Sequence, residues 1–401
     1  MVFESCNGND STVKPPLSEA GRVLLVGSVF SHANYGSHVV MRELLNGFDP
    51  NSFAIVAPAY SGCVEGYEFE PRVLRVGGRH PKYGGLLQVP RTIWQAVRWA
   101  RRQGFSAVVS VHPSLDMLLV GLLVSWILRL PFIPYLHDTI SEATEKWRIH
   151  KLTKFIQGVV FRRAARILVI SDGMAEYYRV KYGLDCVTIR HPYKEAILEP
   201  SDVVTQKNLF WAGGVYGIND KALLRVIGIA TRMGVKTVLT AASATVRDRI
   251  LDWRKSGLLV EPVFYEERSD YLEALRHQGA HVLALNAPTD SSFGHGELAT
   301  IFPTKTPEYL ASGRPILVFC PKDYALAGYF TSKRCGVVVT DADDQAIEDG
   351  IRRVLSDDDD IRELQRNAVA QARMFSAERV AEDFARAVDE VIARGPKRMA
   401  S

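Results

Sequence analysis

The stretch Phe302-Pro-Thr-Lys-Thr-Pro-Glu-Tyr-Leu-Ala-Ser-Gly-Arg-Pro-Ile-Leu-Val-Phe319 decides how this chain can fold. Thr306 suits the N-cap of a helix, and Pro307 suits the first helical position, where no amide hydrogen is missed. Gly313 stops that helix about two turns later, and Pro315 prevents its continuation. The apolar run Ile316–Phe319 is typical of a buried strand. The stretch therefore predicts a short helix that leads into a strand.

The start of this helix gathers groups that bind anions. Thr304, Lys305 and Thr306 place two hydroxyls and an ammonium beside free backbone amides. Glu308, near the same end, can present a carboxylate to a diol such as a ribose. The same residues also suit an ordinary helix start, because an acidic residue in the first turn complements the helix dipole. Spacing alone leaves both interpretations open.

Pro303-Thr-Lys305, followed by Glu308-Tyr-Leu-Ala-x-Gly-x-Pro-Ile316, resembles the donor-site signature of two-domain (GT-B) glycosyltransferases around family 4. The resemblance implies that Lys305 contacts the donor's diphosphate and Glu308 its ribose. Many members carry a second glutamate eight positions before this one, but here position 300 is threonine. Glu297 and His295 lie nearby at other spacings. The resemblance therefore leaves the contacts to the sugar undefined.

Composition narrows the class of protein. The chain has 401 residues, of which 47% are apolar and 23% charged, as in soluble proteins of two to three domains. Its five scattered cysteines, with no CxxC pair, disfavour a disulfide framework or zinc site and favour a reducing compartment. The polar first twenty residues do not read as a signal peptide. We therefore expect a cytoplasmic protein.

Charge is uneven along the chain. Residues 1–200 carry 23 Lys and Arg against 17 Asp and Glu, whereas the remainder carries 26 against 28. This excess is too small to indicate a nucleic-acid-binding protein, but it predicts a basic face on the first domain. The basic, aromatic segment 146–166 suits either a solvated face or peripheral contact with an anionic membrane. The apolar run Met117–Leu130 is shorter than the ~20 residues that span a bilayer, so we expect a buried helix.

Two strand–loop–helix units indicate the fold class. Arg22–Gly27 precedes a loop and a helix from Ser37 to Leu45, and Leu209–Trp211 opens a second such unit. The first loop lacks GxGxxG, which disfavours a nicotinamide or flavin site. The units predict an α/β chain with two Rossmann-like domains, whose ligand-binding edges would face each other across a cleft. The resemblance implies that this is the GT-B arrangement, in which the last helix returns to the first domain. The expected parts are a tail (1–20), a first domain (21–195), a linker (196–207), a second domain (208–375), the returning helix (376–394) and a tail (395–401).

Several polar residues and two glycines follow predicted strands, at the sheet edge where ligands bind in open α/β folds. They are His112, His137, Asp138, Gly213, Gly214 and Tyr265. By the resemblance, His137 contacts the transferred sugar, Lys221 is a second cation for the phosphates, and Tyr265 lies near the base. The loop Asn34-Tyr-Gly-Ser37, with Gly36 and Ser37, would approach the donor, and His112 and Asp138 would face the acceptor. Each also has a structural alternative: a core histidine, a turn glycine or a surface lysine.

The resemblance implies an enzyme that moves a hexose from a nucleoside-diphosphate sugar to an acceptor hydroxyl, with retention of configuration. The acceptor would be a glycan, a lipid-linked molecule or a small molecule. We expect no metal or other cofactor, because no strand-end Asp-x-Asp is present and lysines could hold the leaving diphosphate. We expect no nucleic-acid partner. The broken glutamate pair leaves two alternatives: a non-catalytic sugar-nucleotide or glycan-binding subunit, and an epimerase of the same fold.

Overall fold

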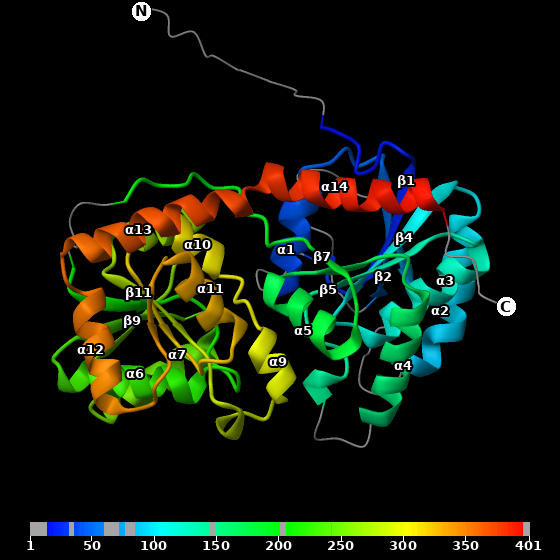
Figure 1. Ribbon diagram of the computed structural model, residues 1–401. Helices are drawn as coiled ribbons and strands as arrows, with labels where there is room; N and C mark the ends of the chain where they lie inside the picture. Colours follow the sequence, from blue (N-terminus) through cyan, green and yellow to red (C-terminus); the bar gives the residue numbers. More distant parts are fainter. Residues whose placement is uncertain are drawn as a thin grey trace, which may run out of the picture.

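The computed structural model describes residues 14–31, 36–59, 72–76, 85–144, 150–200, 206–241 and 243–395. Two parallel sheets, each flanked by helices, form the two halves of the molecule (Figure 1). The first sheet has the order β3-β2-β1-β4-β5-β6-β7 and the second the order β10-β9-β8-β11-β12-β13. In both, the order reverses beside the first strand of the domain. The α/β class with two Rossmann-like domains is as the sequence predicts.

The strands are short and largely apolar. The first sheet contains β1 (Arg22–Gly27), β2 (Phe53–Pro58), β3 (Val73–Val76), β4 (Phe105–His112), β5 (Phe132–Leu136), β6 (Ile167–Val169) and β7 (Cys186–Thr188). The second contains β8 (Asn208–Trp211), β9 (Lys236–Thr240), β10 (Val260–Val263), β11 (Ala280–Ala284), β12 (Ile316–Phe319) and β13 (Val337–Val339). Helices cover both faces of a parallel sheet, so its inner strands are apolar runs. That is why the sequence predicted most of them.

Helices connect successive strands. The first domain contains α1 (Gly36–Leu45), α2 (Gly85–Ala100), α3 (Leu115–Leu128), α4 (His150–Arg163) and α5 (Asp172–Tyr182). The second contains α6 (Asp220–Arg232), α7 (Ala244–Lys255), α8 (Arg268–His277), α9 (His295–Thr300), α10 (Thr306–Ala311), α11 (Ala325–Lys333), α12 (Asp344–Val354) and α13 (Asp359–Ala372). Side-chain caps fix some starts: the Ser171 hydroxyl accepts from the Met174 amide, and Asp358 accepts from the Ile361 amide.

The last helix, α14 (Ala377–Arg394), crosses from the second domain to the first (Figure 1). Val380, Phe384 and Val388 lie in the same buried cluster as residues of β1, β4 and α1. The Phe384 ring centroid lies 6.3 Å from that of Phe48 and 5.9 Å from that of Tyr135. The end of the chain is therefore part of the first domain's core.

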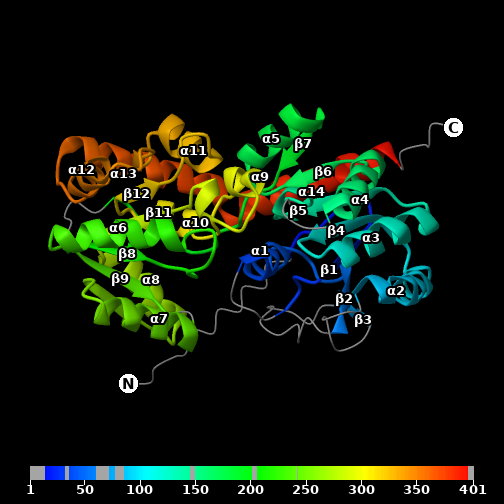
Figure 2. The same ribbon diagram turned by 90° about the horizontal axis from the view of Figure 1, so that it is seen from below.

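A second contact between the domains joins α5 to α9 and α11, which lie close together in both ribbon views (Figures 1 and 2). Small residues allow the close approach. A Cβ added at Gly173 would lie 2.1 Å from the Ala325 Cβ, and one at Gly296 would lie 2.3 Å from the Tyr177 hydroxyl oxygen. The two domains are thus joined on one side by α14 and on the other by α5, α9 and α11.

Two helix starts differ from the prediction. Lys305, not Thr306, occupies the N-cap position of α10, because the Thr306 amide already donates to the Pro303 carbonyl at 2.9 Å. Gly313, at φ +69°, follows the helix end, and β12 begins at Ile316, both as predicted. The sequence also predicts a helix over Pro90–Gln103, whereas α2 spans Gly85–Ala100 and contains Pro90, which keeps a helical φ but cannot donate a backbone hydrogen bond.

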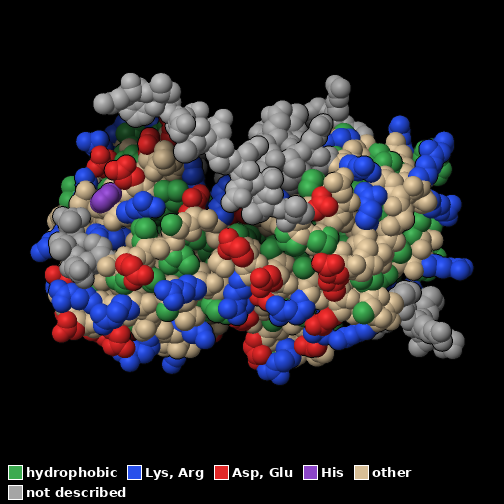
Figure 3. Space-filling model, turned by 90° about the horizontal axis from the view of Figure 1, so that it is seen from above, with side chains coloured by type: hydrophobic (Ala, Val, Ile, Leu, Met, Phe, Trp, Pro, Cys, Tyr) green, Lys and Arg blue, Asp and Glu red, His purple; other side chains and the backbone are tan. Residues whose placement is uncertain are grey.

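The membrane and surface predictions can be compared with the fold. The apolar run near Met117 forms α3, whose side chains are largely buried, as predicted. In the described part of the chain, no helix is long and apolar enough to cross a membrane. Lys and Arg side chains, without Asp or Glu among them, project from the outer end of the first domain (Figure 3). Asn34, Tyr35 and residues 77–84 and 145–149 lie outside the described residues.

Candidate functional site

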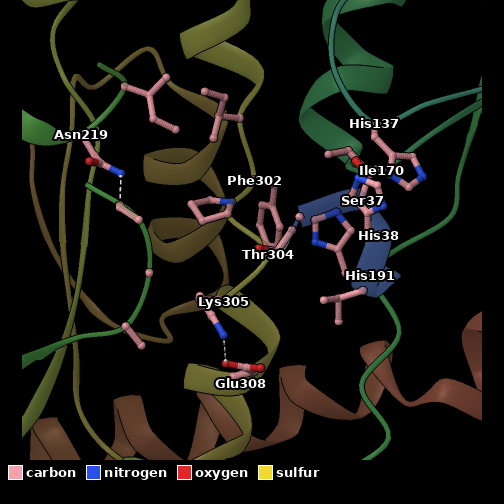
Figure 4. Close-up of a pocket in the computed structure, with 18 of the residues that line it drawn as sticks. Ser37, His38, His137, Ile170, His191, Asn219, Phe302, Thr304, Lys305 and Glu308 are labelled. Carbon is pink, nitrogen blue, oxygen red and sulfur yellow. Dashed lines mark hydrogen bonds and ion pairs between the residues drawn. The ribbon is translucent and has the colours of Figure 1, made fainter. Parts of the chain in front are cut away.

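A cleft of about 1430 Å³ lies between the two domains. Its walls are built largely from residues that follow strands: β4, β5 and β7 on one side, and β8 to β11 on the other. Parallel strands place such residues at one edge of their sheet. The two edges face each other, so polar side chains from both domains converge on one space (Figure 4).

The second-domain wall carries a buried charge cluster around Glu308. Its carboxylate lies 3.1 Å from the Lys305 ammonium and 3.0 Å from the Arg268 guanidinium, and it accepts a hydrogen bond from the Tyr271 hydroxyl. The Lys305 Nζ also lies 4.8 Å from the centroid of the Tyr271 ring. Lys305 is about one-third exposed, whereas Glu308 is buried. The cluster thus presents an ammonium toward the cleft beside an anchored carboxylate.

The charge state of Glu308 follows from these neighbours. Burial alone would raise its pKa, but the Lys305 and Arg268 charges and the Tyr271 hydroxyl together bring the pKa below its usual range. Glu308 is therefore ionised at neutral pH. An ionised carboxylate accepts strong hydrogen bonds from hydroxyl groups. This is the chemistry needed to hold the vicinal hydroxyls of a ribose.

The loop after β8 runs beside Lys305. Gly213 has φ +147°, a conformation that favours glycine, and its amide donates to the Thr240 hydroxyl at 3.0 Å. A Cβ at this position would lie 4.0 Å from the Lys305 Cγ. The Ala212 amide donates to the Tyr309 hydroxyl of α10 at 2.6 Å. This bond fixes the loop, including Gly214, against the helix that carries Glu308.

Four histidines stand on the first-domain wall: His38, His112, His137 and His191. Figure 4 shows three of them, His38, His137 and His191, across the cleft from Lys305 and Glu308. His137 is buried, and neither ring nitrogen has a hydrogen-bond partner among the described residues. The Nδ1 atoms of His112 and His191 likewise have none there. A bound ligand with hydroxyl groups could satisfy all of these atoms.

Burial keeps the imidazoles of His112, His137 and His191 neutral. It lowers the pKa of His112 and of His191 to about 4 and holds the pKa of His137 well below its usual range. A neutral imidazole can both donate and accept hydrogen bonds. The wall is therefore suited to uncharged hydroxyl-bearing groups at neutral pH.

Glu297 bridges the two walls. Its carboxylate, on α9, accepts from the Thr139 backbone amide at 3.0 Å and from the Thr139 hydroxyl. Burial and the nearby Asp138 charge raise the pKa of Glu297 to about 7, and burial raises that of Asp138 to about 6. Glu297 thus lines the cleft, as a donor-site residue should, but its described contacts are with the other domain.

The structure brings most of the predicted residues to the cleft. Those that line it are Gly36, Ser37, His112, His137, Asp138, Gly213, Gly214, Tyr265, Glu297, Thr304, Lys305 and Glu308. Three others do not line it. Lys221 is exposed at the start of α6, and His295 is exposed and lies 3.2 Å from Asp323. Thr306 is buried inside the second domain, so its hydroxyl does not face the cleft.

Thr300 occupies the position of the missing glutamate. It lines the cleft, but its hydroxyl donates to the Gly296 and Glu297 carbonyls of its own helix, each at 3.0 Å. The wall here therefore offers no carboxylate from that position. A sugar in the cleft would meet other groups than in relatives that have the glutamate pair.

Sequence reasoning missed several lining residues. Arg42, Glu43 and Asn46 face the cleft from α1, and burial raises the pKa of Glu43 to about 7. With Val39, they lie at positions i, i+3, i+4 and i+7, which indicates one helix face. Arg268 and Tyr271 also line the cleft but belong to no motif. Their role comes from contact with Glu308, which only the folded chain reveals.

Across the described residues, no group of three or more His, Cys, Asp and Glu side chains is arranged to hold a metal ion. The positive charge that the cleft itself supplies near Glu308 comes from Lys305 and Arg268.

Comparison with known proteins places the fold. Residues 36–192 match a protein family described as Glycosyltransferase Family 4, which confirms the resemblance over the first domain. That match does not include the stretch 302–316, which carried the prediction. No curated protein is significantly similar in sequence.

Several solved structures share the architecture of the whole chain. A sucrose-phosphate synthase from Thermosynechococcus elongatus superposes with a TM-score of 0.68 at 13% identity, covering 94% of this chain and 100% of that one. Anabaena HepE, solved in complex with UDP, gives 0.68 at 15% identity, covering 92% and 100%. A glycosyltransferase from Rickettsia africae gives 0.67 at 10% identity, covering 93% and 99%. The chain therefore has the GT-B fold of glycosyltransferases, as predicted.

Proposed function

We propose that this chain, with its GT-B fold and a first domain that matches glycosyltransferase family 4, is a metal-independent, retaining glycosyltransferase. It would transfer a hexose from a nucleoside-diphosphate sugar to an acceptor hydroxyl. The observation that carries the proposal is the pairing of Lys305 and Glu308 on one wall of the cleft, opposite buried neutral histidines on the other.

The second-domain wall would hold the donor nucleotide. Lys305 is the cation nearest the loop Gly213–Gly214, where a diphosphate could approach the backbone closely because glycine has no side chain. Glu308 would accept hydrogen bonds from the ribose hydroxyls. Tyr265, which follows β10 and lines the cleft, would lie beside the base. The exposed Lys221 is not included in this donor site.

The transfer step creates negative charge on the leaving diphosphate. Fixed cations stabilise such charge without reorganising during the reaction. Lys305 would supply this charge, with Arg268 supporting it through Glu308. No metal is needed in this scheme.

The bond changes follow from retention. The bond between the anomeric carbon and the phosphate oxygen breaks, and the acceptor oxygen forms its bond to that carbon on the same face. The acceptor's proton passes to an oxygen of the departing diphosphate. His137, with both ring nitrogens free of partners among described residues, would bind a hydroxyl of the transferred sugar. His112 and Asp138 would border the acceptor.

Similar structures suggest the first donor to test. HepE from Anabaena was solved with UDP, with UDP and glucose, and with UDP-glucose. Because those matches share only the fold, they support a nucleoside-diphosphate hexose as a class and leave the base and sugar of this chain's donor to experiment.

The test is the release of nucleoside diphosphate from UDP-glucose, GDP-mannose, ADP-glucose and dTDP-glucose, with and without EDTA. We expect one donor to be turned over, slowly with water and faster with an acceptor, and EDTA to leave the rate unchanged. Lys305→Ala should lower the rate about a hundredfold or more, because it removes the positive charge that stabilises the leaving diphosphate in the transition state. Lys221→Ala, a matched lysine outside the cleft, should leave it near the wild-type value.

Other outcomes separate the alternatives. A chain that binds a nucleotide sugar but never releases diphosphate would be a binding subunit rather than an enzyme. A chain that changes the configuration of the donor sugar, but does not transfer that sugar to an acceptor, would be an epimerase. A rate that EDTA abolishes and a divalent cation restores would contradict the metal-independent mechanism.

A further inference from the structure

An exposed basic and aromatic stripe runs along α2. Arg91, Trp94 and Arg98 are exposed at positions i, i+3 and i+7, and Arg101 and Arg102 continue the line just beyond the helix end. This spacing places the side chains on one face of a helix. Trp94 is 61% exposed, and the Arg98 guanidinium carbon lies 5.4 Å from the centroid of its ring. A large apolar ring thus stands in solvent among cations.

Helix α4 carries a similar face. Lys151, Leu152, Lys154 and Phe155 are all exposed in its first half, and Phe155 is 66% exposed. Arg162 and Arg163 are exposed near its end. The opposite face is buried, since Thr153, Ile156, Gln157 and Val160 pack inward. The helix therefore buries one face and leaves apolar and basic side chains together on the other.

Helix α3 lies between these two. It packs against α2 and also contacts α4, and the three helices occupy the flank of the first domain that points away from the second (Figures 1 and 2). At its end, Trp126 and Ile127 are 60% and 41% exposed, beside the exposed Arg129. The three exposed stripes therefore belong to one flank, which we call the α2–α4 face.

Acidic residues are scarce along these helices: Asp116, in the first turn of α3, is the one carboxylate in the sequences of α2, α3 and α4. Residues 89–103, 117–130 and 150–166 contain ten Lys and Arg but no Asp or Glu. Of these ten, Arg166 forms an ion pair with Asp185 at 3.0 Å. The excess of Lys and Arg over Asp and Glu on the α2–α4 face suits an anionic partner.

We propose that the α2–α4 face docks on the surface of an anionic lipid bilayer. Clustered Lys and Arg are attracted to anionic headgroups, while Trp and Phe insert at the boundary between headgroups and acyl chains. The aliphatic Leu152 and Ile127 favour a membrane over a nucleic acid, which offers stacking surfaces and phosphates but no apolar phase. The mixture of exposed aliphatic, aromatic and basic side chains fits a single partner that offers both negative charge and an apolar phase.

The start of α4 brings one end of the α2–α4 face to the cleft. Thr153 lines the cleft, while its neighbours Leu152 and Lys154 are exposed on the proposed docking side. Docking would therefore hold the first-domain wall of the cleft beside the lipid surface. An acceptor anchored in the bilayer could reach it. The docking itself does not rest on the proposed transferase activity and can be tested separately.

The experiment is co-sedimentation of the full chain with vesicles. Vesicles of phosphatidylcholine mixed with phosphatidylglycerol should bind the wild type, and phosphatidylcholine alone should bind it weakly. Each Lys or Arg near an anionic surface strengthens binding about fivefold, so Arg91→Glu with Arg98→Glu should weaken it by at least about twentyfold. Trp94→Ala with Phe155→Ala should weaken it without changing net charge. The matched control is Arg254→Glu with Leu259→Ala, an exposed pair in the second domain, which should bind as the wild type does.

A second measurement detects insertion and guards against misfolded variants. Lipids brominated on the acyl chains should quench tryptophan fluorescence of the wild type, and Trp94→Phe with Trp126→Phe should remove most of that quenching. Thermal melting should show that every variant remains folded. Equal binding to neutral and anionic vesicles, or quenching unchanged in the double variant, would overturn the proposal. So would tight binding to single-stranded RNA with no binding to anionic vesicles.

Discussion

At the scale of single residues, the site depends on a buried carboxylate held by two cations. Glu308 is held by Lys305 and Arg268 and by the Tyr271 hydroxyl. Burying an unpaired carboxylate costs free energy, and these neighbours offset that cost. They thereby keep Glu308 ionised and able to accept hydrogen bonds from ribose hydroxyls. The arrangement also keeps Lys305 at the edge of the cleft before any ligand is bound.

The role of Glu308 can be tested through the ribose itself. The wild type should bind the preferred nucleoside diphosphate about ten- to a hundredfold more tightly than its 2′,3′-dideoxy analogue, because hydrogen bonds to a charged group are strong. Glu308→Gln should remove most of this discrimination while the protein stays folded. Glu273→Gln, an exposed glutamate on α8, is the control and should keep it. Titration calorimetry measures both ligands. Undiminished discrimination in Glu308→Gln would exclude ribose contact.

The sequence could identify Lys305 and Glu308 because they belong to a local motif with a helix start and a strand. It could not identify Arg268 or His191, since each gains its role only when another segment folds against it. Lys221 shows the converse. The family resemblance suggested it as a second cation for the phosphates, but it is exposed at the start of α6 and does not line the cleft. Local spacing predicts where a residue sits along a helix, not which way the loop before it turns.

At the scale of elements, apolar runs predicted most strands because parallel strands are buried on both faces. Helix starts were predicted less well. A start depends on backbone hydrogen bonds such as that from the Thr306 amide to the Pro303 carbonyl, which side-chain preferences do not reveal. Helix α14 is the clearest case of an element whose residues are stabilised by a distant part of the chain. Its buried face is complementary to the first domain, although it follows the second in sequence.

This placement of α14 predicts which domain a core substitution will weaken. Phe384→Ala should destabilise the first domain by about 3–5 kcal/mol, because it removes a fully buried ring and leaves a cavity. Hydrogen exchange should accelerate in β1 and β4, with little change in β8 and β11. Glu382→Ala, on the exposed face of the same helix, should have no such effect. Faster exchange confined to the second domain would show that α14 stabilises that domain instead.

At the scale of the whole molecule, the cleft is closed on one side by Glu297, whose carboxylate reaches Thr139 of the first domain. Because the folded-state pKa of Glu297 is raised to about 7, the folded protein holds a proton there that the unfolded chain releases at lower pH. Glu297 therefore favours folding at acidic pH. This contribution to stability is progressively lost as the pH rises from the ordinary pKa of a glutamate toward 7.

This sign gives a testable pH dependence. Glu297→Gln keeps an oxygen that can accept from the Thr139 amide but removes the charge beside Asp138. Its melting temperature relative to wild type should therefore rise between about pH 5 and about pH 8. Glu142→Gln is the comparison with the opposite sign at lower pH: burial would raise the pKa of Glu142, but hydrogen bonds from Tyr182 and Lys181 outweigh it and lower the pKa. The melting temperature of Glu142→Gln relative to wild type should therefore stay level between about pH 5 and about pH 8 and rise only as the pH falls below the ordinary pKa of a glutamate. A Glu297→Gln melting curve that runs parallel to wild type at every pH would contradict this account.

The central claim is that Lys305 and Glu308 form a site for a nucleoside diphosphate. The most direct test is thermal stabilisation by UDP, GDP, ADP and dTDP, since a ligand that binds only the folded state raises the melting temperature by mass action. We predict that one diphosphate stabilises the wild type with or without EDTA, that Lys305→Ala loses the shift, and that Lys221→Ala keeps it. If no diphosphate stabilises the wild type, or if Lys305→Ala is stabilised as strongly, the cleft is not the donor site proposed here.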